Sequence, residues 1–259
     1  MQTPRWINKP KQVSGPVVLF LHGFMGEKEE WEFIGAKLGL ACASINLPGH
    51  GDCEPAEGDW FTAAVRKIEH FLDEERLEQI VLAGYSMGGR IAMQFALKHP
   101  GFIKGLVLES ANPGLQETYQ RDMRYESDKS WSERFKTEWP DILTDWYDQT
   151  VFSSLRGTPL LRDIINEKQT RDGIAMAAAI TGYSLGKQVS MWDGLSVLDS
   201  PILFVSGALD EKYTRIGSEL ALTSAEIEHV NVEEAGHIVH KEQEEAYLGA
   251  LQRFIEQFS

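Results

Sequence analysis

EQIVLAGYSMGGRIAMQFALKHP (residues 78–100) changes its pattern at the centre. Branched apolar residues precede Tyr85, as in a short buried strand, whereas the apolar residues after Ser86 recur at helical spacing. The junction reads Gly-x-Ser-x-Gly, and Gly84 and Gly88 permit a tight turn without Cβ clashes. A serine on such a strand-to-helix turn presents its hydroxyl at the end of a sheet. Ser86 is therefore predicted to be a catalytic serine.

A second pentapeptide, GYSLG at residues 182–186, fits the same pattern around Ser184. It follows AMAAAIT, which reads as a helical run, and it leads into KQVSMW. The strand that this turn requires does not precede it. We interpret this copy as the Gly-rich end of a helix, and we expect replacement of Ser184 to change turnover by less than about threefold.

Apolar segments typical of buried strands alternate along the chain with amphipathic helical patterns. The strand-like segments are 17–22, 41–47, 79–84, 103–110, 201–207 and 227–232. The helical patterns are 28–38, 61–76, 87–98 and a terminal one at 241–257. This alternation predicts an α/β fold in which helices cover both faces of a mostly parallel sheet. The chain reads as helical between about 112 and 191, which is too long for a loop. We expect a core of residues 1–111 and 192–259 and a helical cap segment at 112–191.

A serine hydroxyl acts at neutral pH beside a base, which is normally a histidine oriented by a carboxylate. Asp210 follows one late strand-like segment and His237 follows the last one, so the order is Ser, Asp, His. That order is the one used by the α/β-hydrolase fold. His240 is an alternative base, but it begins the terminal helix. Asp193 and Asp199 precede a strand instead of following it, which makes them weaker candidates for the acid.

The segment LHGFMG (residues 21–26) ends a strand in His-Gly. In this fold the next backbone N–H faces the nucleophile, so the N–H groups of Phe24 and Met87 are predicted to form the oxyanion hole. His22 and His50, the latter in a Gly/Pro-rich loop, are interpreted as structural residues.

The composition excludes several classes of function. The chain of 259 residues carries a formal net charge of −14 and contains no basic stretch, which argues against nucleic-acid binding. It contains no apolar run long enough to cross a membrane and no signal-peptide pattern, so a cytoplasmic protein is expected. The two cysteines have no metal-ligand spacing, and no nucleotide-binding loop occurs. We expect no metal and no cofactor, and the sequence sets no oligomeric state.

The triad alone does not name a reaction, because esterases, lyases and hormone receptors share it. One residue narrows the choice: Arg90 lies one helical turn after Ser86, on the same face of the predicted helix. It is either a substrate contact or an arginine paired at the helix edge.

The chain resembles one family over nearly its whole length, including the cap segment. The matching motifs are LHGFMGEKEEW, NLPGHG, GYSMGGRIAM, ESANPGL, RYESDKSWSERF, WYDQTVFSSL and GHIVH. They resemble the 2-succinyl-6-hydroxy-2,4-cyclohexadiene-1-carboxylate synthases of menaquinone and phylloquinone biosynthesis. The resemblance implies a lyase that eliminates pyruvate from a small polyanionic substrate, with the triad serine as a base. It leaves open which of the two quinones is made downstream.

The resemblance also implies roles for residues around the serine. Arg90 and Arg124 would bind substrate carboxylates, for which the guanidinium fork is suited. A third basic contact from the cap segment would fall to Lys168 or Arg171, and the spacing leaves both open. Tyr85 and Trp146 match positions that line the pocket, although simple packing explains these aromatic residues equally well.

Two alternative functions remain at this point. A carboxylesterase or C–C bond hydrolase would use the same triad, but its apolar ester pocket would not need Arg90 and Arg124. A receptor that keeps the triad only as pocket lining would bind ligand without turnover, and its activity would survive the loss of Ser86.

Overall fold

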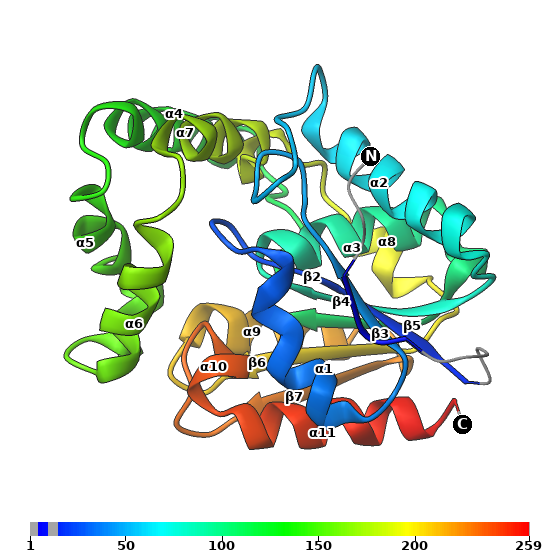
Figure 1. The fold of residues 1–259 in the computed structure, drawn as a ribbon. Coiled ribbons are helices and arrows are strands. Elements are labelled where there is room, and N and C mark those ends of the chain that lie inside the picture. The colour runs from blue at the N-terminus through cyan, green and yellow to red at the C-terminus, as the bar shows by residue number, and fades with distance from the viewer. Residues whose placement is uncertain (1–4, 10–14, 259) are drawn as a thin grey trace.

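The centre of the protein is one seven-stranded sheet, seen in the computed structural model of residues 5–9 and 15–258 (Figure 1). The strand order is β1-β3-β2-β4-β5-β6-β7, and every neighbouring pair is parallel except β1 and β3. The strands are β1 (Arg5–Asn8), β2 (Val17–Leu21), β3 (Cys42–Ile45), β4 (Ile80–Tyr85), β5 (Ile103–Glu109), β6 (Ile202–Gly207) and β7 (Ile227–Val232). The predicted α/β fold with a mostly parallel sheet is confirmed.

The two faces of the sheet carry separate apolar cores, because the central strands are buried on both sides. One core contains residues of α2 (Trp60–Glu75), α3 (Met87–Lys98), α8 (Trp192–Ser196) and α9 (Glu211–Ala221). The other contains residues of α1 (Glu32–Leu38) and of α11 (Glu244–Glu256), the helix that runs along the bottom of Figure 1. The six parallel strands β2 to β7 direct their carboxyl ends to the same side, and β1 runs in the opposite direction.

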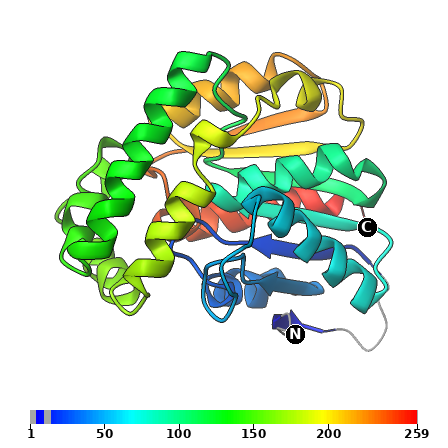
Figure 2. The same cartoon turned by 90° about the horizontal axis from the view of Figure 1, so that it is seen from above.

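Four further helices lie between β5 and β6, beyond the carboxyl ends of the strands (Figure 1). They are α4 (Thr118–Thr137), α5 (Ile142–Tyr147), α6 (Pro159–Lys168) and α7 (Gly173–Gly182). Helices α4 and α7 lie side by side (Figure 2), and the Ser132 hydroxyl on α4 donates to the Ala177 carbonyl on α7 at 2.8 Å. All four helices fall within residues 112–191, the segment expected to form a cap.

Several elements differ from the prediction. Helices α8 and α9 were not among the helical patterns expected from the sequence. Strand β1 was not expected, because its sequence RWIN is short and its residues are only partly buried at the sheet edge. The terminal helix is divided into α10 (Val239–Glu242) and α11, because Gln243 has non-helical dihedral angles. Among the described residues, no helix is both long and apolar enough to cross a lipid bilayer.

Candidate active site

Ser86 lies at the junction of β4 and α3 in a strained backbone conformation. Its φ is 49° and its ψ is −105°, a region that few non-glycine residues adopt. The flanking glycines leave no room for a side chain: a Cβ added to Gly88 would lie 2.4 Å from the Leu21 carbonyl oxygen, and one added to Gly84 would lie 2.5 Å from Gly88. The Ser86 N–H also donates to the Glu109 carbonyl of β5 at 2.8 Å. The turn therefore holds the serine hydroxyl at the carboxyl end of the sheet.

The structure brings Ser86, His237 and Asp210 together. The Ser86 hydroxyl lies 3.2 Å from His237 Nε2, and His237 Nδ1 lies 2.8 Å from Asp210 Oδ2. Asp210 precedes α9 and also accepts a hydrogen bond from the Tyr213 N–H at 3.3 Å. His237 and Asp210 are 4% and 5% exposed. A buried aspartate at Nδ1 holds the imidazole with Nε2 toward the serine, which is the geometry for taking its proton.

Phe24 and Met87 flank Ser86 in the same cavity. Met87 is the first residue of α3, so its N–H has no partner within the helix. The loop that carries Phe24 is fixed by His22, which lies 2.7 Å from the Gly23 carbonyl through Nδ1 and accepts the Leu47 N–H through Nε2 at 3.1 Å. Burial lowers the pKa of His22 to about 4, so its ring is a neutral structural link. The oxyanion-hole role of Phe24 and Met87 stays a prediction.

A cavity of about 520 Å³ opens beside Ser86, within the range typical of small-molecule sites. It lies between the core and the helices that follow β5. The lining combines aromatic side chains with three cationic ones: Phe24, Trp131, Trp146, Phe152, Tyr183 and Tyr213, with Arg90, Arg124 and Lys212. A cavity of this composition is suited to an apolar ring that carries several anionic groups.

Arg90 extends from α3 into this cavity and has no acidic partner among the described residues. Its Nη1 donates to the Gln188 side chain at 3.2 Å, and its guanidinium lies 5.5 Å from the centre of the Phe61 ring. Gln188 is itself fixed by a hydrogen bond to the Asn112 carbonyl at 3.0 Å. Burial lowers the pKa of Arg90 to about 10, and the nearby charge of Arg124 acts in the same direction. Asp128 acts in the opposite direction from a distance. The site therefore holds a cation with no direct ion pair among the described residues.

Arg124 extends into the cavity from α4 and is paired. Its Nε donates to both carboxylate oxygens of Asp128, at 2.9 and 3.0 Å. Asp128 lies one turn further along α4, is 2% exposed, and also accepts the Ser184 hydroxyl at 2.7 Å. Ser184, the serine of the second pentapeptide, thus lies behind an arginine of the cavity and forms no part of the Ser-His-Asp arrangement.

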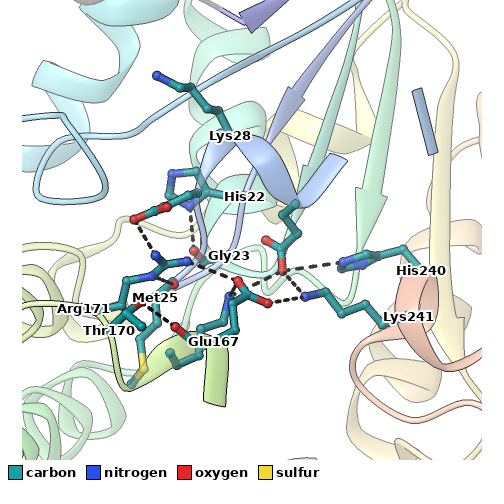
Figure 3. A network of polar contacts seen from close by, with 12 residues as sticks. His22, Gly23, Met25, Lys28, Glu167, Thr170, Arg171, His240 and Lys241 are labelled. Carbon is teal, nitrogen blue, oxygen red and sulfur yellow. Dashed lines mark hydrogen bonds and ion pairs between the residues drawn. The ribbon is translucent and has the colours of Figure 1, made fainter. Parts of the chain in front are cut away.

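Lys168 and Arg171, the two candidates for the third basic contact, both belong to a buried ionic network (Figure 3). Lys168 Nζ lies 2.8 Å from Glu167 and 3.8 Å from Glu30. Arg171 pairs with Glu27 at 2.7 Å and with Glu167 at 3.2 Å. Lys168 lines a second, smaller cavity beside Ser86, whereas Arg171 lines neither cavity.

His240, the alternative base, lies in the same network and away from the serine. Its Nδ1 lies 2.9 Å from the Glu109 carboxylate, and its Nε2 lies 3.7 Å from Glu30 (Figure 3). Burial lowers the pKa of this imidazole, but the two carboxylates more than offset that effect and raise it to about 9. His240 is therefore an imidazolium held between two acids, where it cannot serve as a base for Ser86.

The two aromatic candidates both line cavities beside Ser86. Trp146 lines both cavities, and its ring centre lies 5.2 Å from that of Phe24. Tyr85 is buried at the smaller cavity, against the rings of His237 and His240. Their contact with a substrate stays a prediction.

Sequence reasoning missed three residues: Asp128 and Lys212 line the larger cavity, and Gln188 holds Arg90 beside it. Lys212 could have been found, because it stands two positions after Asp210 on the first turn of α9. Asp128 carries a weaker signal, its spacing of four residues from Arg124. Gln188 carries none, since its contact with Arg90 joins segments 98 residues apart.

The chain matches the model of the alpha/beta hydrolase family over residues 18–250. It is 34% identical to the 2-succinyl-6-hydroxy-2,4-cyclohexadiene-1-carboxylate synthase of Enterobacter sp. (strain 638), with 93% of this chain and 92% of the relative covered. The enzyme of that name from Salmonella typhimurium is 33% identical, with 95% and 96% covered.

Solved structures share the fold. MenH from S. aureus superposes with a TM-score of 0.92 at 24% identity, with 99% of each chain covered. A thermophilic esterase from Thermogutta terrifontis, solved with malate bound, superposes with a TM-score of 0.83 at 23% identity, with 94% of this chain and 90% of that chain covered. The family model and the sequence relatives place the chain in the alpha/beta hydrolase family and, within it, among the 2-succinyl-6-hydroxy-2,4-cyclohexadiene-1-carboxylate synthases.

Proposed function

We propose that this enzyme eliminates pyruvate from 2-succinyl-5-enolpyruvyl-6-hydroxy-3-cyclohexene-1-carboxylate and forms 2-succinyl-6-hydroxy-2,4-cyclohexadiene-1-carboxylate. One observation carries the proposal: Arg90 and Arg124 line the same cavity as Ser86 and His237. A polyanion bound by these arginines would lie beside a serine that has its base in place. Membership among the synthases of this product supports the same reaction.

The proposed chemistry begins with proton transfer. His237 accepts the Ser86 proton, and the serine oxygen removes the ring proton next to the succinyl carbonyl. The electron pair passes through the ring double bond and expels the enolpyruvyl oxygen, which leaves as the enolate of pyruvate and takes up the proton held by His237. One C–H and one C–O bond break, and the ring becomes a diene. Asp210 stabilises the imidazolium that forms at His237.

Two backbone N–H groups would stabilise the charge that develops on the succinyl carbonyl. These are the groups of Phe24 and Met87, which flank Ser86 in the cavity. Donors that are fixed before the reaction need no reorganisation as the charge appears. Serine acts here as a base, so no acyl-enzyme forms.

The substrate carboxylates would be held by local cations within a protein of net charge −14. Arg90 and Arg124 supply two of them, and we propose Lys168 as the third because it lines the cavity next to Ser86. Tyr85 and Trp146 would contact the ring and its substituents. Residues 112–191 would act as the cap over the site, and residues 1–111 and 192–259 as the core.

The test measures pyruvate released from the freshly prepared substrate, by coupling to lactate dehydrogenase. Controls are the spontaneous breakdown of the substrate and the Ser86→Ala variant. Stoichiometric pyruvate far above both controls is the expected result. Background release from folded protein would reject the proposal.

A parallel assay separates the lyase from a carboxylesterase. Arg124→Ala is expected to raise the KM for the polyanionic substrate while weak hydrolysis of a neutral nitrophenyl ester stays nearly unchanged. Equal loss of both activities would make Arg124 a structural residue and remove the argument from charge.

A further inference from the structure

A carboxylate in the wall of an anion-binding cavity needs an explanation. Asp128 lines the larger cavity, is 2% exposed, and carries the sign of charge that repels the proposed substrate. Burying a carboxylate is costly unless hydrogen bonds and an opposite charge offset the loss of water. Asp128 has both: two hydrogen bonds from Arg124 Nε and one from the Ser184 hydroxyl.

The way Asp128 contacts Arg124 leaves the useful edge of the guanidinium free. Both hydrogen bonds come from Nε. Within residues 5–9 and 15–258, no hydrogen bond engages Nη1 or Nη2 of Arg124. Those two nitrogens form the edge that binds a carboxylate in two parallel hydrogen bonds. The Arg124 side chain is 38% exposed, so without a partner it would adopt several rotamers.

Ser184 is built into the fold so that its hydroxyl meets Asp128. The Gly186 N–H donates to the Ser184 oxygen at 3.1 Å, which directs the hydroxyl proton to Asp128 Oδ2. A Cβ on Gly186 would lie 2.4 Å from the Arg121 carbonyl of α4, and one on Gly182 would lie 2.3 Å from the Trp60 ring. The glycines of GYSLG therefore serve close packing, and its serine supports Asp128.

We propose that Asp128 and Ser184 are positioning residues that hold Arg124 with its Nη edge toward a substrate carboxylate. They act through Arg124 and do not touch the substrate. The benefit is preorganisation: an arginine already ordered in the free enzyme loses less side-chain entropy when the substrate binds. This inference rests on the proposed function, in which Arg124 binds a carboxylate of the substrate.

The first experiment is Ser184→Ala, measured by pyruvate release. We expect KM to rise about three- to tenfold, less than for the loss of a direct charged hydrogen bond to the substrate because Arg124 itself remains, with kcat changed by less than about twofold. Ser132→Ala is the matched control. It also removes a buried serine hydrogen bond from α4, but that bond ends on the Ala177 carbonyl and leads to no arginine. Its KM should stay unchanged.

A double-mutant cycle then separates positioning from general damage to the fold. Because Ser184 acts only through Arg124, Ser184→Ala should add nothing to the KM of Arg124→Ala. Asp128→Asn, which keeps the shape but loses the charge, should raise KM and likewise add nothing in the Arg124→Ala background. The inference would be overturned if the effects of the two substitutions on KM multiplied in the double variant, or if kcat fell as far as kcat/KM.

A measurement without substrate keeps the inference separate from the proposed function. The Nε–H of Arg124 is held by a buried carboxylate, so its ¹⁵N NMR signal should be sharp and should exchange slowly with water. Ser184→Ala should broaden that signal, and Ser132→Ala should not. If no pyruvate is released but this signal behaves as expected, the proposed substrate is rejected and the positioning role stands. An Arg124 signal that does not respond to Ser184→Ala would reject the positioning role.

Discussion

Replacing each of the two cavity arginines by methionine should change the stability of the fold in opposite directions. Both substitutions remove a cation that binds substrate, so both should raise KM. Their effects on stability differ because Asp128 neutralises Arg124, whereas Gln188, a neutral amide, is the hydrogen-bond partner of Arg90. We expect Arg90→Met to stabilise the fold and Arg124→Met to destabilise it.

The magnitudes follow from the site. Burial lowers the pKa of Arg90 from 12.5 to about 10, which corresponds to roughly 3 kcal/mol against the charged form. Arg90 keeps some contact with cavity water, so we expect Arg90→Met to raise the free energy of unfolding by about 1–2 kcal/mol. Methionine also keeps an apolar contact with the Phe61 ring. Arg124→Met leaves the Asp128 carboxylate buried without its cation. Because the Arg124 side chain is 38% exposed, we expect a cost of about 1–3 kcal/mol, below that of a fully buried pair.

Urea unfolding gives the stabilities, and the pyruvate assay gives the kinetics. Loss of a charge-assisted hydrogen bond corresponds to a rise in KM of about 10- to 100-fold for each variant. The reasoning is refuted if Arg90→Met is less stable than the parent protein, or if the free energy of unfolding changes in the same direction in both variants. An unchanged KM in either variant would remove that arginine from the binding site.

Three further predictions concern the network and the serine turn. Lys168→Gln should raise KM severalfold in the pyruvate assay, whereas Arg171→Gln, which changes neither cavity wall, should leave KM within about twofold; the reverse order would assign the third contact to Arg171. Gly88→Ala should cost about 3 kcal/mol or more in urea unfolding because its Cβ meets backbone atoms, whereas Gly101→Ala, with nothing within 4 Å, should cost less than about 1 kcal/mol. The raised pKa of His240 stabilises the folded state below pH 6.5, and this contribution, up to about 3 kcal/mol, is lost as the pH rises toward 9. The free energy of unfolding of His240→Gln should therefore be flatter than that of the parent protein across this window, and parallel curves would contradict the assignment.

Local patterns were sufficient for the elements that place the triad. The strand before Ser86 and the helix after it differ in periodicity, and the order of the later strands indicated where Asp210 and His237 fall. Strand β1 was not predicted, because an edge strand of four residues that are at most partly buried has no apolar run. Its pairing with β3 depends on a neighbour more than thirty residues away.

The electrostatic parts of the site could not be predicted, because the charges that meet there are far apart in sequence. His240 stands close to His237 in the chain, yet its partner Glu109 is 131 residues away and decides its protonation. Ser184 and its partner Asp128 are 56 residues apart. Sequence context excluded Ser184 as the nucleophile, but only the folded chain gave that serine a role.

The ionic network in Figure 3 also restricts how this protein can be recombined with its relatives. Glu27 and Glu30 follow β2, whereas Lys168 and Arg171 come from the segment between β5 and β6. Arg171 neutralises Glu27 across the two segments, and such complementarity selects the correct partner surface. A chimera that takes residues 112–191 from another enzyme would remove Arg171 from Glu27, whereas Glu30 would keep Lys241 and His240 of the core. Moving the loop after β2 together with this segment keeps Glu27 and Arg171 paired, so the two are best exchanged as one unit in protein engineering.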